Sequence, residues 1–239
     1  MATRVTLARV LARRCASKTP ARDSRPRARA AVVRASASAA DEVYRAMSSN
    51  QEVAVVAVVG TSLVRDAATR HRTAPTATAA LGRSLMCSLL LGTFKGEDET
   101  TQLTFKGDGP LGQIIATSTH EGRVKGLVSN PNADPPLRKD GKLNVGGAVG
   151  SGVLTVSRAH PSMKTPFTGT VELASGEIAE DVAKYLLESE QVGSAIAVGV
   201  SIDRECEVIA ARGFIVQILP FEGDETINKK KKTIASLPS

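Results

Sequence analysis

The chain has 239 residues, of which 42% are hydrophobic and 23% charged, a balance typical of a folded protein with one large domain or two small ones. Aromatic residues make up 3% and tryptophan is absent, which argues against the base-stacking surfaces of single-stranded nucleic-acid binders. No apolar run reaches the roughly 18 residues that a transmembrane helix needs, so we expect no membrane span.

The formal net charge of +7 comes from one end of the chain. Residues 1–39 hold ten of the 31 basic residues and one of the 24 acidic residues, Asp23. The rest of the chain carries 21 basic and 23 acidic side chains. This nearly neutral body predicts neither nucleic acid nor membrane as a partner.

Residues 1–38 have the composition of an organellar transit peptide. They are rich in Arg, Ala and Ser, poor in acids, and lack the apolar core of a secretory signal. Small residues after Arg34 offer a processing point. The many small and hydroxylated residues favour the chloroplast stroma, and Arg13-Arg14 keeps the mitochondrion as the alternative. We therefore expect the folded domain within residues 39–222.

The domain is expected to begin with two strands and two helices. Residues 41–48 form the first strand, and residues 53–59 (VAVVAVV) form a second, apolar without a break, as in a strand covered on both faces. Thr61 or Ser62 can cap a helix ending near His71. The next helix, from Pro75 to Leu91, is apolar nearly all round, which predicts burial in a core or against a second subunit.

From Thr100 the hydrophobic pattern changes to a period of two. It predicts strands at 100–106, 111–119, 123–129, 153–156 and 167–173, and a closing hairpin of residues 195–202 and 207–219. Ser175 can cap one more helix, whose apolar stripe includes Val182 and Tyr185. Because helices and strands do not alternate regularly, the order predicts an α+β fold with a mixed or largely antiparallel sheet packed with helices.

Cysteine and histidine offer no local metal site. The three Cys (15, 87 and 206) and three His (71, 120 and 160) include no pair at ligand spacing. Cys87 lies in the apolar helix and is expected to be a buried hydrophobe. Cys206 has acidic neighbours that disfavour a thiolate. We assign no metal ligand, cofactor residue or nucleophile.

The glycine-rich segment Gly141–Gly152 invites a phosphate-loop interpretation. It lacks the Gly-Lys-Ser/Thr triplet and the dinucleotide-binding spacing, so we interpret its glycines as turn residues, with a small-ligand site as the alternative. Glu177, Glu180 and Asp181 are explained by their place at a helix start, and no base accompanies them. The residues alone therefore predict a binding protein and not an enzyme.

Five segments taken together resemble the heat-shock protein 33 family of redox-regulated chaperones, also called 33 kDa chaperonins. The resemblance runs in order from Asp41 to Pro220. The segments are RHRTAPTATAALGR (70–83), FKGDGPLG (105–112), GKLNVGGAVG (141–150), SGEIAED (175–181) and GFIVQILP (213–220).

The resemblance implies an ATP-independent holdase that binds unfolding client proteins through apolar surface on its sheet, in a dimer with exchanged helical elements. The family's zinc module, with its C-x-C and C-x-x-C motifs, has no counterpart in these 239 residues, and Cys87 and Cys206 do not match it. Residues 223–239 would begin the linker to that module. We therefore expect no bound zinc and constitutive client binding, with an inactive dimerising fragment as the alternative.

Overall fold

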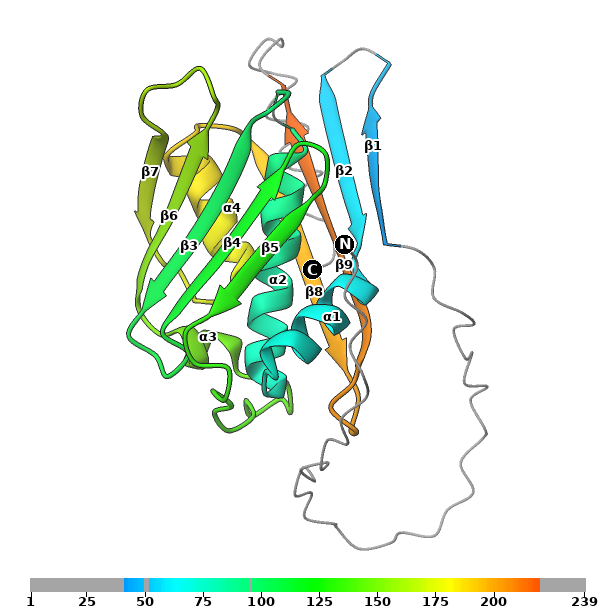
Figure 1. Cartoon of the computed structure of the whole chain (residues 1–239), viewed down its shortest axis with the longest axis vertical. Coiled ribbons are helices and arrows are strands. Elements are labelled where there is room, and N and C mark those ends of the chain that lie inside the picture. Colours follow the sequence, from blue (N-terminus) through cyan, green and yellow to red (C-terminus); the bar gives the residue numbers. More distant parts are fainter. Residues whose placement is uncertain (1–40, 50–51, 95, 220–239) are drawn as a thin grey trace, which may run out of the picture.

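The structure is a computed structural model that describes residues 41–49, 52–94 and 96–219 (Figure 1). The segments expected to form the transit peptide (1–38) and the linker (223–239) lie outside the described residues. Its elements follow in the order β1 Glu42–Met47, β2 Val53–Val59, α1 Thr61–His71, α2 Pro75–Gly92, β3 Thr100–Gly107, β4 Gln113–Thr119, β5 Val124–Val128, α3 Val145–Val149, β6 Gly152–Ala159, β7 Phe167–Glu172, α4 Ala179–Glu188, β8 Ser194–Ile202 and β9 Val208–Ile218.

The strands form two sheets, with the orders β1-β2-β9-β8 and β5-β4-β3-β6-β7. Every strand pair in both sheets is antiparallel. Helices α2 and α4 lie between the two sheets, as Figure 1 shows. The predicted α+β class is confirmed, as is the closing hairpin of β8 and β9.

Helix α2 is the centre of the core. All of its residues are buried except Pro75 and Arg83, and it contacts strands of both sheets. Pro75 starts it at a position where a missing N–H costs nothing. The all-round apolar sequence is therefore explained by burial between two sheets of a single chain. No helix in the described part of the chain combines the length and hydropathy that a bilayer crossing requires.

Strand β2 departs from its prediction. Its burial alternates, with Ala54, Val56 and Val58 buried toward the helices and the intervening residues only half-buried. The unbroken apolar run predicted a strand covered on both faces, whereas the core covers only one face of β2. Its other face carries apolar side chains that no described element covers.

Two helix caps also differ from their predictions. The residue before α1 is Gly60, which provides no side-chain cap. Asp41, the residue before β1, caps the helix instead: its carboxylate accepts hydrogen bonds from the backbone N–H groups of Ser62 (2.9 Å) and Leu63 (2.5 Å). Helix α4 is capped at Ile178 by Asp181, whereas Ser175 Oγ accepts only the Glu177 N–H. The Asp41 contact does not follow from local residue preference, whereas Asp181 caps its own helix from three residues away, as in a capping box.

The glycine-rich segment folds into a short helix, α3, where the sequence predicted only turns. Asn144 caps it by accepting the Gly147 N–H at 3.0 Å. The turn Gly107–Gly112 docks on its end, with Gly109 N–H donating to Val149 O at 2.9 Å. A Cβ at Gly107 would lie 1.9 Å from Val149 O, so this approach requires glycine. Both glycine motifs thus build one structural contact.

Candidate interaction surface

The outward face of the four-stranded sheet is apolar. Register and pleat place alternate residues of β1, β2, β8 and β9 on this face, opposite the helices. We call this set the apolar face: Tyr44, Ala46, Val53, Val55, Ala57, Val59, Ala195, Ala197, Phe214 and Val216. Tyr44 and Ala46 are exposed and the others are half-buried.

Charged residues stand at one end of this surface. The register aligns Glu42 of β1 with Val59 of β2 and Arg212 of β9. This row carries two charged side chains and forms a polar border at that end of the apolar face. The Tyr44 hydroxyl donates a hydrogen bond to the Glu42 carboxylate, and this bond with the adjacent negative charge raises the pKa of Tyr44. Contiguous apolar surface with a polar border marks a site of protein interaction.

The outward face of the five-stranded sheet has the opposite chemistry. Its side chains form hydrogen-bonded ladders across the strands, such as Thr155 to Thr170 and Ser157 to Thr168, both at 3.1 Å. We call this set the hydroxyl face: Thr100, Gln102, Thr104, Thr117, Thr119, Thr155, Ser157, Thr168 and Thr170. The apolar side chains Ile115, Leu127 and Val153 lie among them, and Leu127 is 45% exposed. Of the two outward faces, only the apolar face offers a broad hydrophobic surface.

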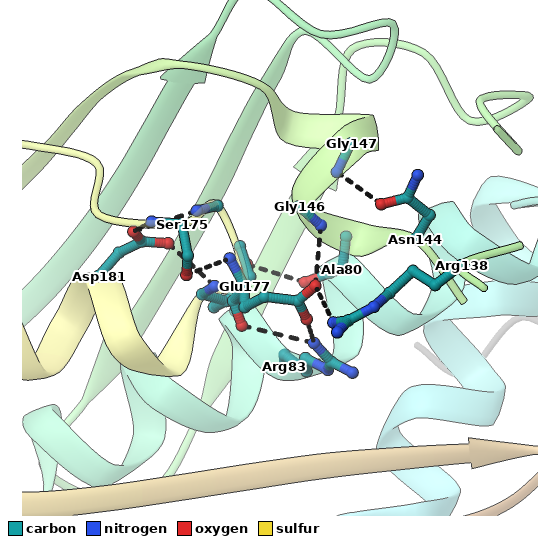
Figure 2. A network of polar contacts seen from close by, with 12 residues as sticks. Ala80, Arg83, Arg138, Asn144, Gly146, Gly147, Ser175, Glu177 and Asp181 are labelled. Atoms are coloured by element: carbon teal, nitrogen blue, oxygen red, sulfur yellow. Dashed lines mark hydrogen bonds and ion pairs between the residues drawn. The ribbon is translucent and has the colours of Figure 1, made fainter. Parts of the chain in front are cut away.

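Figure 2 shows a polar network around Glu177, on the loop before α4. Its Oε2 pairs with Nη1 of Arg83 at 2.6 Å, and its Oε1 accepts from Arg138 Nη1 at 3.3 Å and from the Gly146 N–H at 3.2 Å. The carboxylate therefore joins α2, the loop before α3 and α3 itself. No nucleophile or proton-transfer partner belongs to these contacts, so the network holds the fold together.

Asp181 performs a similar role beside it. This fully buried carboxylate accepts backbone N–H groups from Ala174, Ser175 and Gly176 on Oδ1, and from Ile178 on Oδ2. Ile178 has a φ of +72°, a strained value for a β-branched residue. The four hydrogen bonds hold the loop in that conformation.

A cavity of about 290 Å³ lies next to this network and tests the small-ligand interpretation. Its polar lining is already engaged: Asp108 Oδ1 accepts the Ser151 N–H at 2.8 Å, and the Gly146 N–H goes to Glu177. The glycine-rich segment thus uses its backbone groups internally.

The candidate redox and metal residues are scattered. Cys87 is buried in α2, where burial raises the pKa of its thiol, and Cys206 lies in the β8–β9 turn. His71 ends α1, as expected, and its side chain is exposed. Within residues 41–219, apart from the gaps at 50–51 and 95, no three His, Cys, Asp or Glu side chains gather as a metal site. These residues do not fit the zinc that the resemblance implies.

Known proteins resemble the chain over this same region. The family model described as Hsp33 protein matches residues 41–239. The 33 kDa chaperonin of Geobacter sulfurreducens is 47% identical over 199 residues, covering 83% of this chain and 65% of that protein. The 33 kDa chaperonin of Desulforamulus reducens is 45% identical over 199 residues, covering 83% and 67%. The crystal structure of the Thermotoga maritima 33 kDa chaperonin superimposes with a TM-score of 0.76 at 39% identity, covering 82% of this chain and 68% of that one.

Among the described residues, one outward sheet face is apolar and no described element covers it, a feature that marks sites of protein interaction. The chain belongs to the Hsp33 family, whose members named here are chaperonins. It spans about two thirds of the length of the relatives it matches. The resemblance implied client binding through apolar surface on the sheet but left its residues unassigned, although one signal, the unbroken VAVVAVV run, was visible.

Proposed function

We propose that this chain is an ATP-independent holdase that binds unfolding proteins on its apolar face. The observation that carries the proposal is the contrast between the two sheets of a chaperone-family fold, one faced with Val, Ala and Phe and the other with Thr and Ser. Unfolding proteins expose apolar side chains, and removing these side chains from water against such a face favours the complex.

We further propose that binding needs no oxidation. The 239 residues contain neither C-x-C nor C-x-x-C, and Cys87 is sealed in the core with its thiol pKa raised by burial. A thiolate is the form that oxidants attack, so this residue is a poor redox switch. Client binding would then depend on a surface that is present at all times.

Light scattering of a heat-unfolding enzyme tests this proposal. The 239-residue chain should suppress scattering near a stoichiometric ratio, in reductant, with chelator and without ATP. Peroxide should leave the suppression unchanged, and so should the replacement of both Cys87 by Ala and Cys206 by Ser. A requirement for peroxide would refute constitutive binding. A folded chain that never suppresses aggregation would refute the holdase function.

Two parts of the proposal concern the setting in which the chain acts. The Arg-, Ala- and Ser-rich residues 1–38 support import into the chloroplast stroma, with the mitochondrion as the alternative. Family membership supports a homodimer with exchanged helices. A fluorescent fusion of residues 1–38 would test the first, and light scattering of the purified chain during size exclusion would test the second.

A further inference from the structure

Strand β1 is an open edge of the four-stranded sheet. In the described part of the chain it pairs only with β2, and all six of its residues are exposed. Val43 and Met47 project on one side, at 36% and 59% exposure, and Tyr44 on the other at 56%. The strand therefore extends past the helices that cover the sheet's inner face.

The register identifies which backbone groups face outward. Ser48 N–H bonds to Val53 O at 2.9 Å, so this aligned pair is hydrogen-bonded. In an antiparallel ladder such pairs alternate along the strand, which directs the N–H and C=O of Tyr44 and Ala46 toward β2. The same groups of Val43, Arg45 and Met47 must point away, to the open edge.

The hydrogen bonds between β2 and β9 support this assignment of inward and outward groups on β1. Leu219 N–H bonds to Glu52 O at 2.8 Å and Gly60 N–H bonds to Ala211 O at 3.0 Å. The hydrogen-bonded pairs of β2 with β9 are therefore the even-numbered residues of β2. Its odd-numbered residues are left to bond β1, as the Ser48–Val53 pair requires.

The edge is also held in place. Asp41 is tied to the start of α1, and Arg45 Nη2 donates to His120 O in the β4–β5 turn at 2.9 Å. At the other end, Ser48 Oγ accepts the N–H groups of Glu52 and Val53. A strand fixed at both ends offers its outward groups without an ordering cost on binding.

The other three sheet edges carry protection that β1 lacks. Strand β8 contacts α2 and α4, and β7 contacts α4. Strand β5 is five residues long with Lys125 and Gly126 within it. Strand β1, with the sequence EVYRAM, lacks Pro, Gly, Lys and a register shift against β2, which are features by which proteins usually block strand addition. Its two charged side chains, Glu42 and Arg45, are engaged by the Tyr44 hydroxyl and by His120 O.

We propose that β1 captures an extended segment of an unfolding client as an additional strand. The inference rests on the proposed holdase function and names how the client is held. Backbone hydrogen bonds recognise any extended chain whatever its sequence, which suits a binder of many unfolding proteins. Tyr44 and Ala46 belong to the apolar face, so the added strand would extend the same surface on which client side chains are buried.

Hydrogen exchange of the full 239-residue chain tests this directly, with reduced and carboxymethylated α-lactalbumin as a permanently unfolded client. Exchange at the amides of Val43, Arg45 and Met47 should slow by about tenfold or more on binding. Tyr44 and Ala46, already bonded to β2, should change little. Uniform protection of β1, or no protection at the three outward amides, would overturn strand addition.

A proline variant gives a second test. Val43→Pro removes one outward N–H and leaves the bonds of Glu42 and Tyr44 to β2, whereas Val43→Thr keeps the N–H and the β-branched shape. We expect severalfold weaker suppression of client aggregation for Val43→Pro only. If Val43→Pro proves unfolded, Met47→Pro with Met47→Thr provides the same comparison.

The outcomes separate the two proposals. Equal activity of the proline and threonine variants, with suppression by the wild-type chain intact, would refute strand addition and leave the holdase function standing. Absence of suppression by the wild-type chain would refute both. If Val43→Pro instead abolishes a dimer seen by light scattering, the edge binds a second copy of this chain, and the client proposal is wrong.

Discussion

Arg83 and Glu177 form an ion pair at 2.6 Å although 94 positions separate them, and both side chains are only about one-fifth exposed. Arg83 is one of two residues of α2 that are not buried. Its guanidinium lies at the edge of the core, where it pairs with the Glu177 carboxylate. The pair fastens the loop before α4 to the central helix, beside the Gly146 N–H that the same carboxylate binds.

We expect Glu177→Gln to lower the free energy of unfolding by about 1.5–3 kcal/mol, because hydrogen bonds to a charged group in a partly buried site are lost. Asp66→Asn is the matched control, since it breaks the exposed Asp66–Arg70 pair on α1 and should cost less than about 0.5 kcal/mol. Urea unfolding monitored by circular dichroism measures both. Equal costs would show that the Glu177 network contributes no more than a surface ion pair.

Asp181→Ala should destabilise the protein by more than about 3 kcal/mol. The substitution leaves four backbone N–H donors without their acceptor around a buried site, and it releases the strained Ile178. Glu180→Gln changes an exposed carboxylate in the same helical turn and should cost only a few tenths of a kcal/mol. Thermal unfolding of the two variants decides, and a small loss for Asp181→Ala would contradict the role we assign to it.

Cys87 should make stability fall at alkaline pH. Burial raises the pKa of its thiol in the folded state, whereas in the unfolded chain a thiol titrates near about 8.5. Above that pH only the unfolded state loses the proton, so raising the pH favours unfolding. The contribution is complete below about pH 8.5 and declines by about 1.4 kcal/mol per pH unit above it.

Urea unfolding at pH 7.5, 8.5 and 9.5 would measure this decline for the wild type and for Cys87→Ala. The variant is expected to lose less stability between pH 8.5 and 9.5 than the wild type, whatever its stability at pH 7.5. Parallel pH profiles of the two proteins would show that Cys87 ionises as easily in the folded as in the unfolded state.

The segment Gly141–Gly152 should not bind nucleotides. The N–H groups of Gly146, Gly147 and Ser151 are bonded to Glu177, Asn144 and Asp108 within the fold, so these donors are not arranged for a phosphate. Adding millimolar ATP with Mg²⁺ should leave the melting temperature unchanged, because only a ligand of the folded state raises it. A saturable rise in melting temperature would favour the small-ligand alternative.

Periodicity in the sequence predicted most strands and the buried central helix, because period-two and all-apolar patterns reflect burial directly. The Asp41 cap of α1 was beyond it, since that contact depends on where the chain returns in space. The Asp181 cap of α4 spans only three residues, and the sequence placed Asp181 at the helix start without identifying it as the cap. Helix α3 was hidden because glycines that favour turns locally are held helical by the docked 107–112 turn.

The residues of the apolar face escaped prediction for a different reason. A run such as VAVVAVV is the same whether one or both faces of the strand are covered, and the difference lies in how many layers the fold places around the sheet. Only the structure shows a single helical layer beneath β2. The residues that look like surplus core are therefore the candidate client-binding surface.

The central claim is that one sheet face binds clients and the other does not. Val55→Thr with Val216→Thr changes the apolar face, and Ile115→Thr with Val153→Thr makes the same kind of change on the sheet that carries the hydroxyl face. The measurement is light scattering of a heat-unfolding client in reductant without ATP, with all proteins shown to be folded. We expect the first double variant to lose suppression severalfold and the second to match the wild type. Equal suppression by both variants would contradict the claim.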